Sequence, residues 1–124
     1  MSKKLSEMTV GELVDSQEFR HELEEQISME IGHHDKMKAE ASRSGMRLQR
    51  SPVTSLRERG LFDAENMTVC YKLILEKQLS PSYFSAAERE YIKVCCQMAA
   101  WRTLDKALIK EREEQEKEGG QDAN

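Results

Sequence analysis

The chain has 124 residues, of which 38% are hydrophobic and 34% charged, and its formal net charge is −4. Globular domains usually have about 45–50% apolar and about 25% charged residues, so this composition predicts one domain with a modest core. Glycine and proline are scarce, with 6 and 2 residues. Few helix breakers and many Glu, Lys and Arg residues favour long amphipathic helices over sheets.

The sequence contains no pattern typical of export or of membrane insertion. No apolar run follows the lysines near the N-terminus, and no stretch reaches the roughly 18 apolar residues of a spanning helix. The three cysteines, Cys70, Cys95 and Cys96, lie in apolar helical contexts. Such cysteines are typical of reduced thiols that pack in a core, so we expect a cytoplasmic protein without membrane contact.

Charge is distributed unevenly along the chain. Residues 7–35 contain nine acidic residues and one basic residue, whereas residues 36–59 contain seven basic and two acidic residues. Residues 60–109 contain equal numbers of acidic and basic residues, and residues 110–124 contain three basic and six acidic residues. The acidic and basic segments are candidates for pairing with each other, within one chain or between two copies.

The N-terminal part predicts two helices after a flexible lead-in at residues 1–8. Thr9 and Glu12 have the spacing of a capping box, which predicts a short helix from Val10. Asp15 and Ser16 favour caps, so they are expected to interrupt it. An apolar residue then recurs every fourth position, which indicates an amphipathic helix. These residues are Phe19, Leu23, Ile27 and Ile31. Whether this helix stops near Gly32 or continues to about residue 41 stays open.

Residues 42–55 lose this period and contain Ser, Gly and Pro, so they are expected to form a basic loop. Ser55 to Glu58 has the spacing of a cap and predicts one helical turn that ends at Gly60. Asp63 is the expected N-cap of the next helix, whose apolar residues begin at Met67. Together with the last helix, it predicts an αα-hairpin of residues 64–79 with residues 86–118.

The clearest pattern in the sequence is one long C-terminal helix. Ser85 and Glu88 form a capping-box pattern at its start. An apolar line with helical spacing follows for about six turns. Its members are Ala87, Tyr91, Val94, Met98, Trp101, Leu104 and Leu108. Asp105 falls where a strict heptad requires an apolar residue, which argues against a simple two-stranded coiled coil.

The apolar line of the last helix is longer than the other predicted helices can cover. Part of it should therefore stay free for a partner. Its Trp and Tyr residues, with the neighbouring arginine, are of the types enriched at interface hot spots. The candidate partner-binding residues are Tyr91, Met98, Trp101, Arg102 and Leu108.

The sequence does not support a metal site or a catalytic site. Glu18 with His21, and Glu30 with His33, have the (i, i+3) spacing of helical di-metal sites. Both pairs lie on one predicted helix and point about 120° apart, so they do not converge on one metal. No glycine-rich phosphate loop or nucleophile motif occurs in the sequence. We therefore assign no metal, cofactor or catalytic residue.

The arginines of the basic segment favour a second function, because arginine binds phosphate in a bidentate manner. The candidate nucleic-acid-binding residues are Arg43, Arg47, Arg50, Arg57 and Arg59. No aromatic residues alternate with them for base stacking, and the total charge is negative. The arginines can instead pair with the acidic helix of the same chain or of another copy.

The sequence therefore predicts an all-α bundle at residues 9–118, with a disordered tail at 119–124. Its leading function is a non-catalytic protein–protein interaction module, such as an adaptor, regulator or assembly component. We expect a homo-oligomer that forms through the apolar line of the last helix, with charge complementarity setting the register. The alternative is a nucleic-acid-associated regulator that uses the arginine segment.

Overall fold

The computed structural model describes residues 4–78, 80 and 82–122, and within these ranges it contains helices and no strand. The elements are a 3-10 turn η1 (Leu5–Glu7) and helices α1 (Val10–Leu13), α2 (Gln17–Arg43), α3 (Pro52–Glu58), α4 (Ala64–Leu75) and α5 (Ala86–Asp122). The predicted all-α fold with one long final helix is confirmed.

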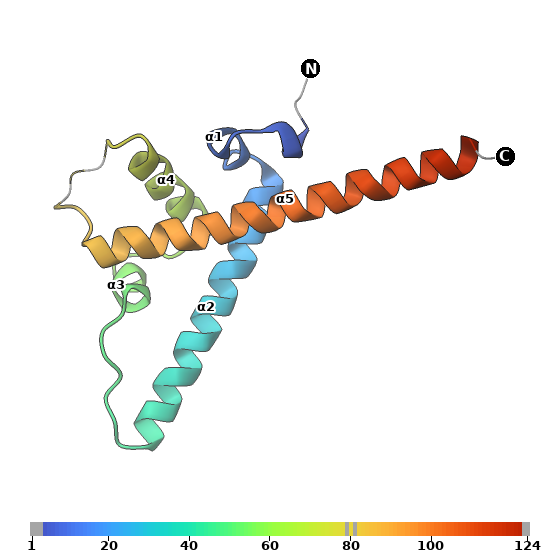
Figure 1. The fold of residues 1–124 in the computed structure, drawn as a ribbon. Coiled ribbons are helices and arrows are strands. Elements are labelled where there is room, and N and C mark those ends of the chain that lie inside the picture. Colours follow the sequence, from blue (N-terminus) through green and yellow to red (C-terminus); the bar gives the residue numbers. More distant parts are fainter. Residues whose placement is uncertain (1–3, 79, 81, 123–124) are drawn as a thin grey trace.

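Helices α2 and α5 cross, and α3 and α4 lie beside the N-terminal part of α5 (Figure 1). α5 contacts α2, α4, α3 and η1, and α2 is its largest contact. The predicted hairpin of α4 and α5 is present, but it packs together with α2 around one crossing. Beyond the crossing, the C-terminal parts of α2 and α5 extend away from each other.

Four of the predicted helix starts, those of α1, α2, α4 and α5, are confirmed by a side-chain cap. Thr9 caps α1 in a full capping box, and the side chain of Ser16 accepts a hydrogen bond from the backbone of Phe19 at the start of α2. Asp63 caps α4 in the same way. At α5 the box is reciprocal: the Ser85 backbone donates to Glu88 Oε1 (2.9 Å), and the Glu88 backbone donates to Ser85 Oγ (3.1 Å).

The predicted start of the short helix at Ser55 is wrong. α3 begins one turn earlier, with Ser51 as its N-cap and Pro52 in its first turn. Proline is favoured there because the first helical N–H groups have no partner within the helix. The basic loop is correspondingly shorter than 42–55, because α2 continues to Arg43 before it.

Helix α2 continues through Gly32 and ends where Gly45 takes a positive φ of 70°. Gly60 ends α3 with the same backbone conformation, as predicted. α4 ends at Leu75, earlier than expected, because Lys77 adopts a φ of 57° and Gln78 donates back to the carbonyl of residue 73. This hydrogen bond is that of a Schellman ending. Position 79, the predicted end of the hairpin's first helix, lies outside the described residues.

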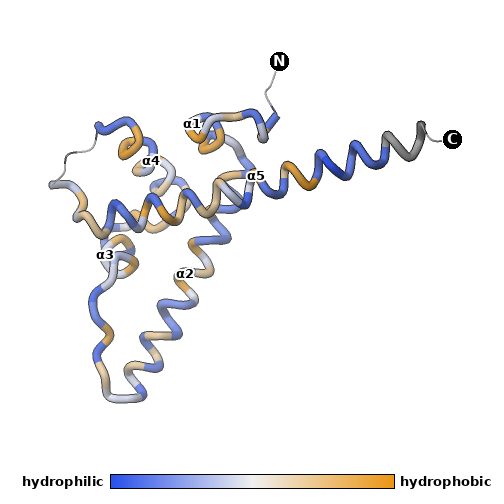
Figure 2. Tube along the Cα trace, viewed as in Figure 1, coloured by the Kyte–Doolittle hydropathy of each residue, from blue (hydrophilic) through white to orange (hydrophobic). Residues whose placement is uncertain are grey.

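Parts of the expected flexible lead-in and tail are helical in the described residues. Within the predicted lead-in, η1 lies against α5, where Ser6 donates a 2.8 Å hydrogen bond to Glu111. α5 continues to Asp122, beyond the expected end at 118, and residues 123–124 lie outside the described ranges. Figure 2 shows that the projecting part of α5 is mostly hydrophilic. The core therefore belongs to the crossing and not to the projecting part.

The buried face of α5 is not the predicted apolar line. The residues of α5 that are buried at the crossing are mainly small: Ile92, Cys95, Cys96, Ala99, Ala100 and Thr103. Small side chains let helix axes approach closely, which a crossing of α5 with both α2 and α4 requires. The predicted line stays largely outside: Tyr91 and Leu104 are half-buried at its edges, while Ala87, Val94, Met98, Trp101 and Leu108 are exposed.

Candidate functional site

Four large apolar side chains lie on the side of α5 that faces away from the core. We call Val94, Met98, Trp101 and Leu108 the outer stripe; their exposed fractions are 41%, 40%, 67% and 51%. Trp101 stands nine positions after the fully buried Ile92, and nine steps of about 100° place two side chains on opposite faces of a helix. The two faces of α5 are thus both apolar, and only one of them is covered.

The five predicted partner-binding residues divide into two groups. Met98, Trp101 and Leu108 are exposed members of the outer stripe. Tyr91 and Arg102 are half-buried and bond to α2. Val94, which was in the predicted apolar line but not among the partner-binding candidates, belongs with the exposed group. Its spacing of four residues to Met98 and seven to Trp101 is the signal that places it there.

Tyr91 links α5 to α2. Its hydroxyl donates a 2.9 Å hydrogen bond to Glu30 Oε2, and its ring lies 6.0 Å from that of Phe62. Burial, together with the nearby Cys95 and the Glu30 carboxylate, raises the pKa of Tyr91 well above its usual range. Tyr91 is therefore a neutral donor that holds α5 to α2.

Arg102 belongs to an ion cluster around the buried Glu22, which was not predicted from the sequence. Glu22 is 3% exposed, and its carboxylate lies 2.6 Å from Lys106 Nζ and 3.5 Å from Arg102 Nε. The hydrogen bond with Glu22 raises the pKa of Lys106. The burial of Glu22 could have been predicted from its position. Glu22 and the buried Gln26 lie on the same face of α2 as the apolar residues Phe19, Leu23 and Ile27.

One cluster of possible metal ligands is present in the described residues. One ligand atom from each of His21, Glu22 and Glu25 lies within 4.8 Å of the others. His21 Nε2 is 3.2 Å from Glu25, so His21 does not use the predicted partner Glu18. The Glu22 carboxylate already holds two cationic side chains. A metal ion there would compete with Lys106 and Arg102, and the cluster carries no assignment.

The Glu30 and His33 pair is likewise not joined. Glu30 accepts hydrogen bonds from Gln26 Nε2 (2.9 Å) and from Tyr91. Both carboxylate oxygens of Glu30 are thus used within the fold. This residue holds α2 against α5 and offers no free ligand.

All three cysteines are free and buried, as the sequence indicated. Burial raises the pKa of the Cys95 thiol to about 11, and it raises the pKa values of Cys70 and Cys96 as well. A thiol reacts as the thiolate, so neutral buried thiols are poor nucleophiles. The cysteines therefore act as small packing residues at the crossing of α5 with its neighbours.

Three of the five candidate nucleic-acid-binding arginines are bound to carboxylates of the same chain. Arg57 pairs with Asp35 of α2 at 2.8 Å, and Arg50 pairs with Glu58. Arg59 lies 3.4 Å from Glu88, and its guanidinium lies 4.7 Å from the ring centres of Tyr83 and Phe84. Arg43 and Arg47 are exposed and form no ion pair within the part of the chain that the structure describes.

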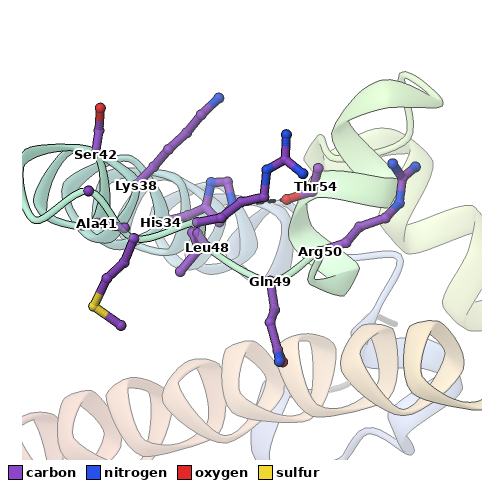
Figure 3. A pocket seen from close by; sticks show the side chains of 11 residues that line it. His34, Lys38, Ala41, Ser42, Leu48, Gln49, Arg50 and Thr54 are labelled. Carbon is purple, nitrogen blue, oxygen red and sulfur yellow. Dashed lines mark hydrogen bonds between the residues drawn. The ribbon is translucent and has the colours of Figure 1, made fainter.

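A basic hollow of about 580 Å³ lies between α2, the loop that follows it and the start of α3. Lys38, Arg47 and Arg50 line it, and no carboxylate is among the described lining residues. Figure 3 shows His34 of α2 reaching across to Thr54 of α3, and their side chains form a 3.0 Å hydrogen bond. The loop thus lies along α2 and presents positive charge on an open surface.

No family model, curated protein or solved structure matches this chain. Among the described residues, no helix combines the length and the apolar character needed to cross a membrane. Two surfaces of the chain are therefore candidate functional sites. One is the exposed apolar stripe on a helix whose other face is buried, and the other is the basic hollow.

Proposed function

We propose that this protein is a non-catalytic interaction module that associates with a second copy of itself through the outer stripe of α5. The observation that carries the proposal is the exposure of four large apolar side chains on one face of a helix whose other face is fully packed. Scattered exposed apolar residues are common, whereas a row of them at helical spacing is typical of an interface.

The outer stripe has features of an interface centre. Trp101 is in the middle of the row and is its most exposed member. Tryptophan is enriched at hot spots because a large rigid side chain buries much area at small entropic cost. α2 and α4 hold the opposite face of α5, so the stripe is preorganised and little ordering is needed on binding.

A second copy is the occupant that the charges beside the stripe favour. Glu90 stands before the stripe and Arg112 stands after it, and both are exposed. An inverted copy of the same helix presents Arg112 opposite Glu90 and Glu90 opposite Arg112. Complementary charges at both ends orient a helix pair and disfavour other arrangements.

The mass of the protein in solution tests this proposal. Light scattering and sedimentation over a range of concentrations should give a dimer for the wild type and a monomer for Trp101→Ala. Met29→Ala is the matched control, because Met29 is 59% exposed but lies on α2. It should dimerise like the wild type. A wild-type monomer at the highest concentration, or equal masses for the wild type and Trp101→Ala, would contradict the proposal.

The basic hollow supports a second candidate, a nucleic-acid-associated regulator. Lys38, Arg47 and Arg50 line one open surface without a carboxylate among the described lining residues, and Arg43 lies close by at the end of α2. Against this, Arg50, Arg57 and Arg59 already pair with carboxylates. We therefore rank self-association first.

A gel shift with single- and double-stranded oligonucleotides at low salt tests the second candidate. Affinity should fall steeply with salt, and Arg43→Ala with Arg47→Ala should remove most of it. Arg57→Ala, whose guanidinium is held by Asp35, is the control and should change the affinity little. The absence of a shift at low salt would exclude this function.

We also infer a reducing, cytoplasm-like compartment. Its support is chemical: the three cysteines are free, buried and neutral, which fits a protein that never forms disulfides. Titration of thiols in unfolded protein purified from its native cells should give three reactive thiols per chain, as all three cysteines are free. A lower number would argue against this compartment.

A further inference from the structure

We infer that the two copies pair with their α5 helices antiparallel, around a two-fold axis that passes beside Trp101. This inference rests on the proposed self-association and specifies its geometry. It follows from the positions of five residues on the outer face of α5 and from the signs of their charges.

The five residues form one line along the helix. At about 100° per residue, each lies within about 20° of the direction of Trp101. They are Glu90, Val94, Trp101, Leu108 and Arg112. All five are exposed, and the packed neighbours α2 and α4 contact α5 on its opposite face, through residues such as Cys96 and Thr103.

The line is symmetric about its centre. Val94 and Leu108 each stand seven residues from Trp101, and Glu90 and Arg112 each stand eleven residues from it. At 1.5 Å per residue, these distances are about 10 Å and about 17 Å along the axis. An antiparallel copy centred on Trp101 therefore places Leu108 opposite Val94 and Arg112 opposite Glu90.

A parallel pair would bring like charges together. Glu90, Asp105 and Arg112 would each face its own copy, and like charges in contact disfavour an interface. In the antiparallel pair, Asp105 lies four residues from the axis, so its two copies are separated by about 12 Å along the helices. Asp105, which argues against a simple two-stranded coiled coil, is therefore compatible with the antiparallel pair.

Each end of the antiparallel pair gains an ion pair between opposite charges. Within the described residues, the one ion pair of Glu90 is a 3.9 Å approach of Lys93 on the same helix, and the Glu90 side chain is 71% exposed. Such a contact is weak and leaves the carboxylate available. Arg112 is exposed on the projecting part of α5 and has no ion pair within the described residues.

Charge reversal on the full-length protein tests this register. Glu90→Arg alone places arginine opposite Arg112 at both ends, and Arg112→Glu alone places glutamate opposite Glu90 at both ends. Each single variant should dimerise about tenfold more weakly than the wild type. An equimolar mixture of the two should form heterodimers with wild-type affinity, because every facing pair again has opposite charges. The double variant should also regain wild-type affinity.

The protein contains one tryptophan, so its fluorescence reports directly on the interface. The tryptophan emission of the wild type should shift to shorter wavelength as the protein concentration is raised. The concentration at the midpoint of this shift should match the dissociation constant of the dimer. Sedimentation gives the masses, and circular dichroism confirms that the variants stay helical. The weakening should shrink at high salt because exposed ion pairs are screened.

The possible failures are distinguishable. If the wild type dimerises through Trp101 but neither single reversal weakens it, the antiparallel register is wrong and self-association stands. A parallel pair predicts that outcome, together with a heterodimer tighter than the wild type. If the wild type stays monomeric, the proposed function itself fails, and the register fails with it.

Discussion

The Lys106 ammonium lies 2.6 Å from the carboxylate of Glu22, which is almost fully buried between α2 and α5. Arg102 approaches the same carboxylate at 3.5 Å. The two cations lie one turn apart on α5, so one glutamate on α2 joins two successive turns of α5. This ion cluster stands next to the apolar crossing and sets how α5 lies on α2.

Glu22→Ala should lower the free energy of unfolding by about 2 kcal/mol, because a buried carboxylate with charged partners contributes more than a surface ion pair. Chemical denaturation at neutral pH measures this. Glu24→Ala is the control, since Glu24 is exposed on the same helix, and should change stability by less than about 0.5 kcal/mol. Equal effects of the two substitutions would show that the cluster does not stabilise the crossing.

Glu88 should stabilise the start of α5 in a pH-dependent manner. Burial opposes its charge, but hydrogen bonds from Ser85 and Ser55, with the charge of Arg59, outweigh burial and lower the pKa of Glu88. A lowered folded pKa gives stability that is present above the ordinary value of 4.5 and is lost as pH falls through the folded value.

Glu88→Ala should therefore destabilise the protein by about 1–2 kcal/mol at pH 7. The difference from the wild type should be smaller at pH 3 than at pH 7, because the stability that a lowered pKa contributes is lost as pH falls below the ordinary value of 4.5. Thermal unfolding at both pH values measures it, with Glu113→Ala, at an exposed position of the same helix, as the comparison. A difference that is the same at both pH values would assign the effect to packing and not to charge.

Cys95 should make the fold sensitive to alkali. Burial raises the pKa of its thiol from an ordinary value of 9.0 to about 11. A raised folded pKa means that the unfolded chain releases its proton first. Stability is therefore full below pH 9 and falls as pH rises from 9 to 11, by on the order of 2–3 kcal/mol for a shift of this size.

Cys95→Ala should make the loss of stability with rising pH less steep. A smaller decline should remain from Cys70, Cys96, Tyr71, Tyr91 and Lys106, whose pKa values are also raised. Urea unfolding at pH 7.5, 9 and 10.5 gives the slope for each protein. Identical slopes for the wild type and Cys95→Ala would contradict the prediction, whatever the stability of the variant at pH 7.5.

The small residues on the buried face of α5 should not tolerate enlargement. Ala99 is fully buried at the crossing, so Ala99→Leu adds three carbon atoms where no space exists and should cost about 1–3 kcal/mol. Ala87→Leu is the matched control, because Ala87 is exposed on the same helix. It should leave the melting temperature nearly unchanged. A tolerated Ala99→Leu would mean that the crossing is loosely packed.

The local structure of this protein was largely readable from its sequence. Thr9, Ser16, Asp63 and Ser85 each mark a helix start, because a side chain that accepts a hydrogen bond from the next turn acts within four residues. The apolar period of α2 identified Phe19, Leu23 and Ile27 as core residues. These features depend only on neighbours along the chain.

Only the tertiary structure decided which face of α5 is buried. Tyr91, Met98 and Trp101 form the row of larger side chains, yet the residues buried at the crossing are Cys95, Cys96 and Ala99, because close approach of three helices requires small side chains. The hydrophobic pattern of one helix does not determine the distance at which neighbouring helices pack against it. For the same reason, the burial of Glu22 was missed: its cost is offset by Lys106 and Arg102, which come from a helix 80 residues further along.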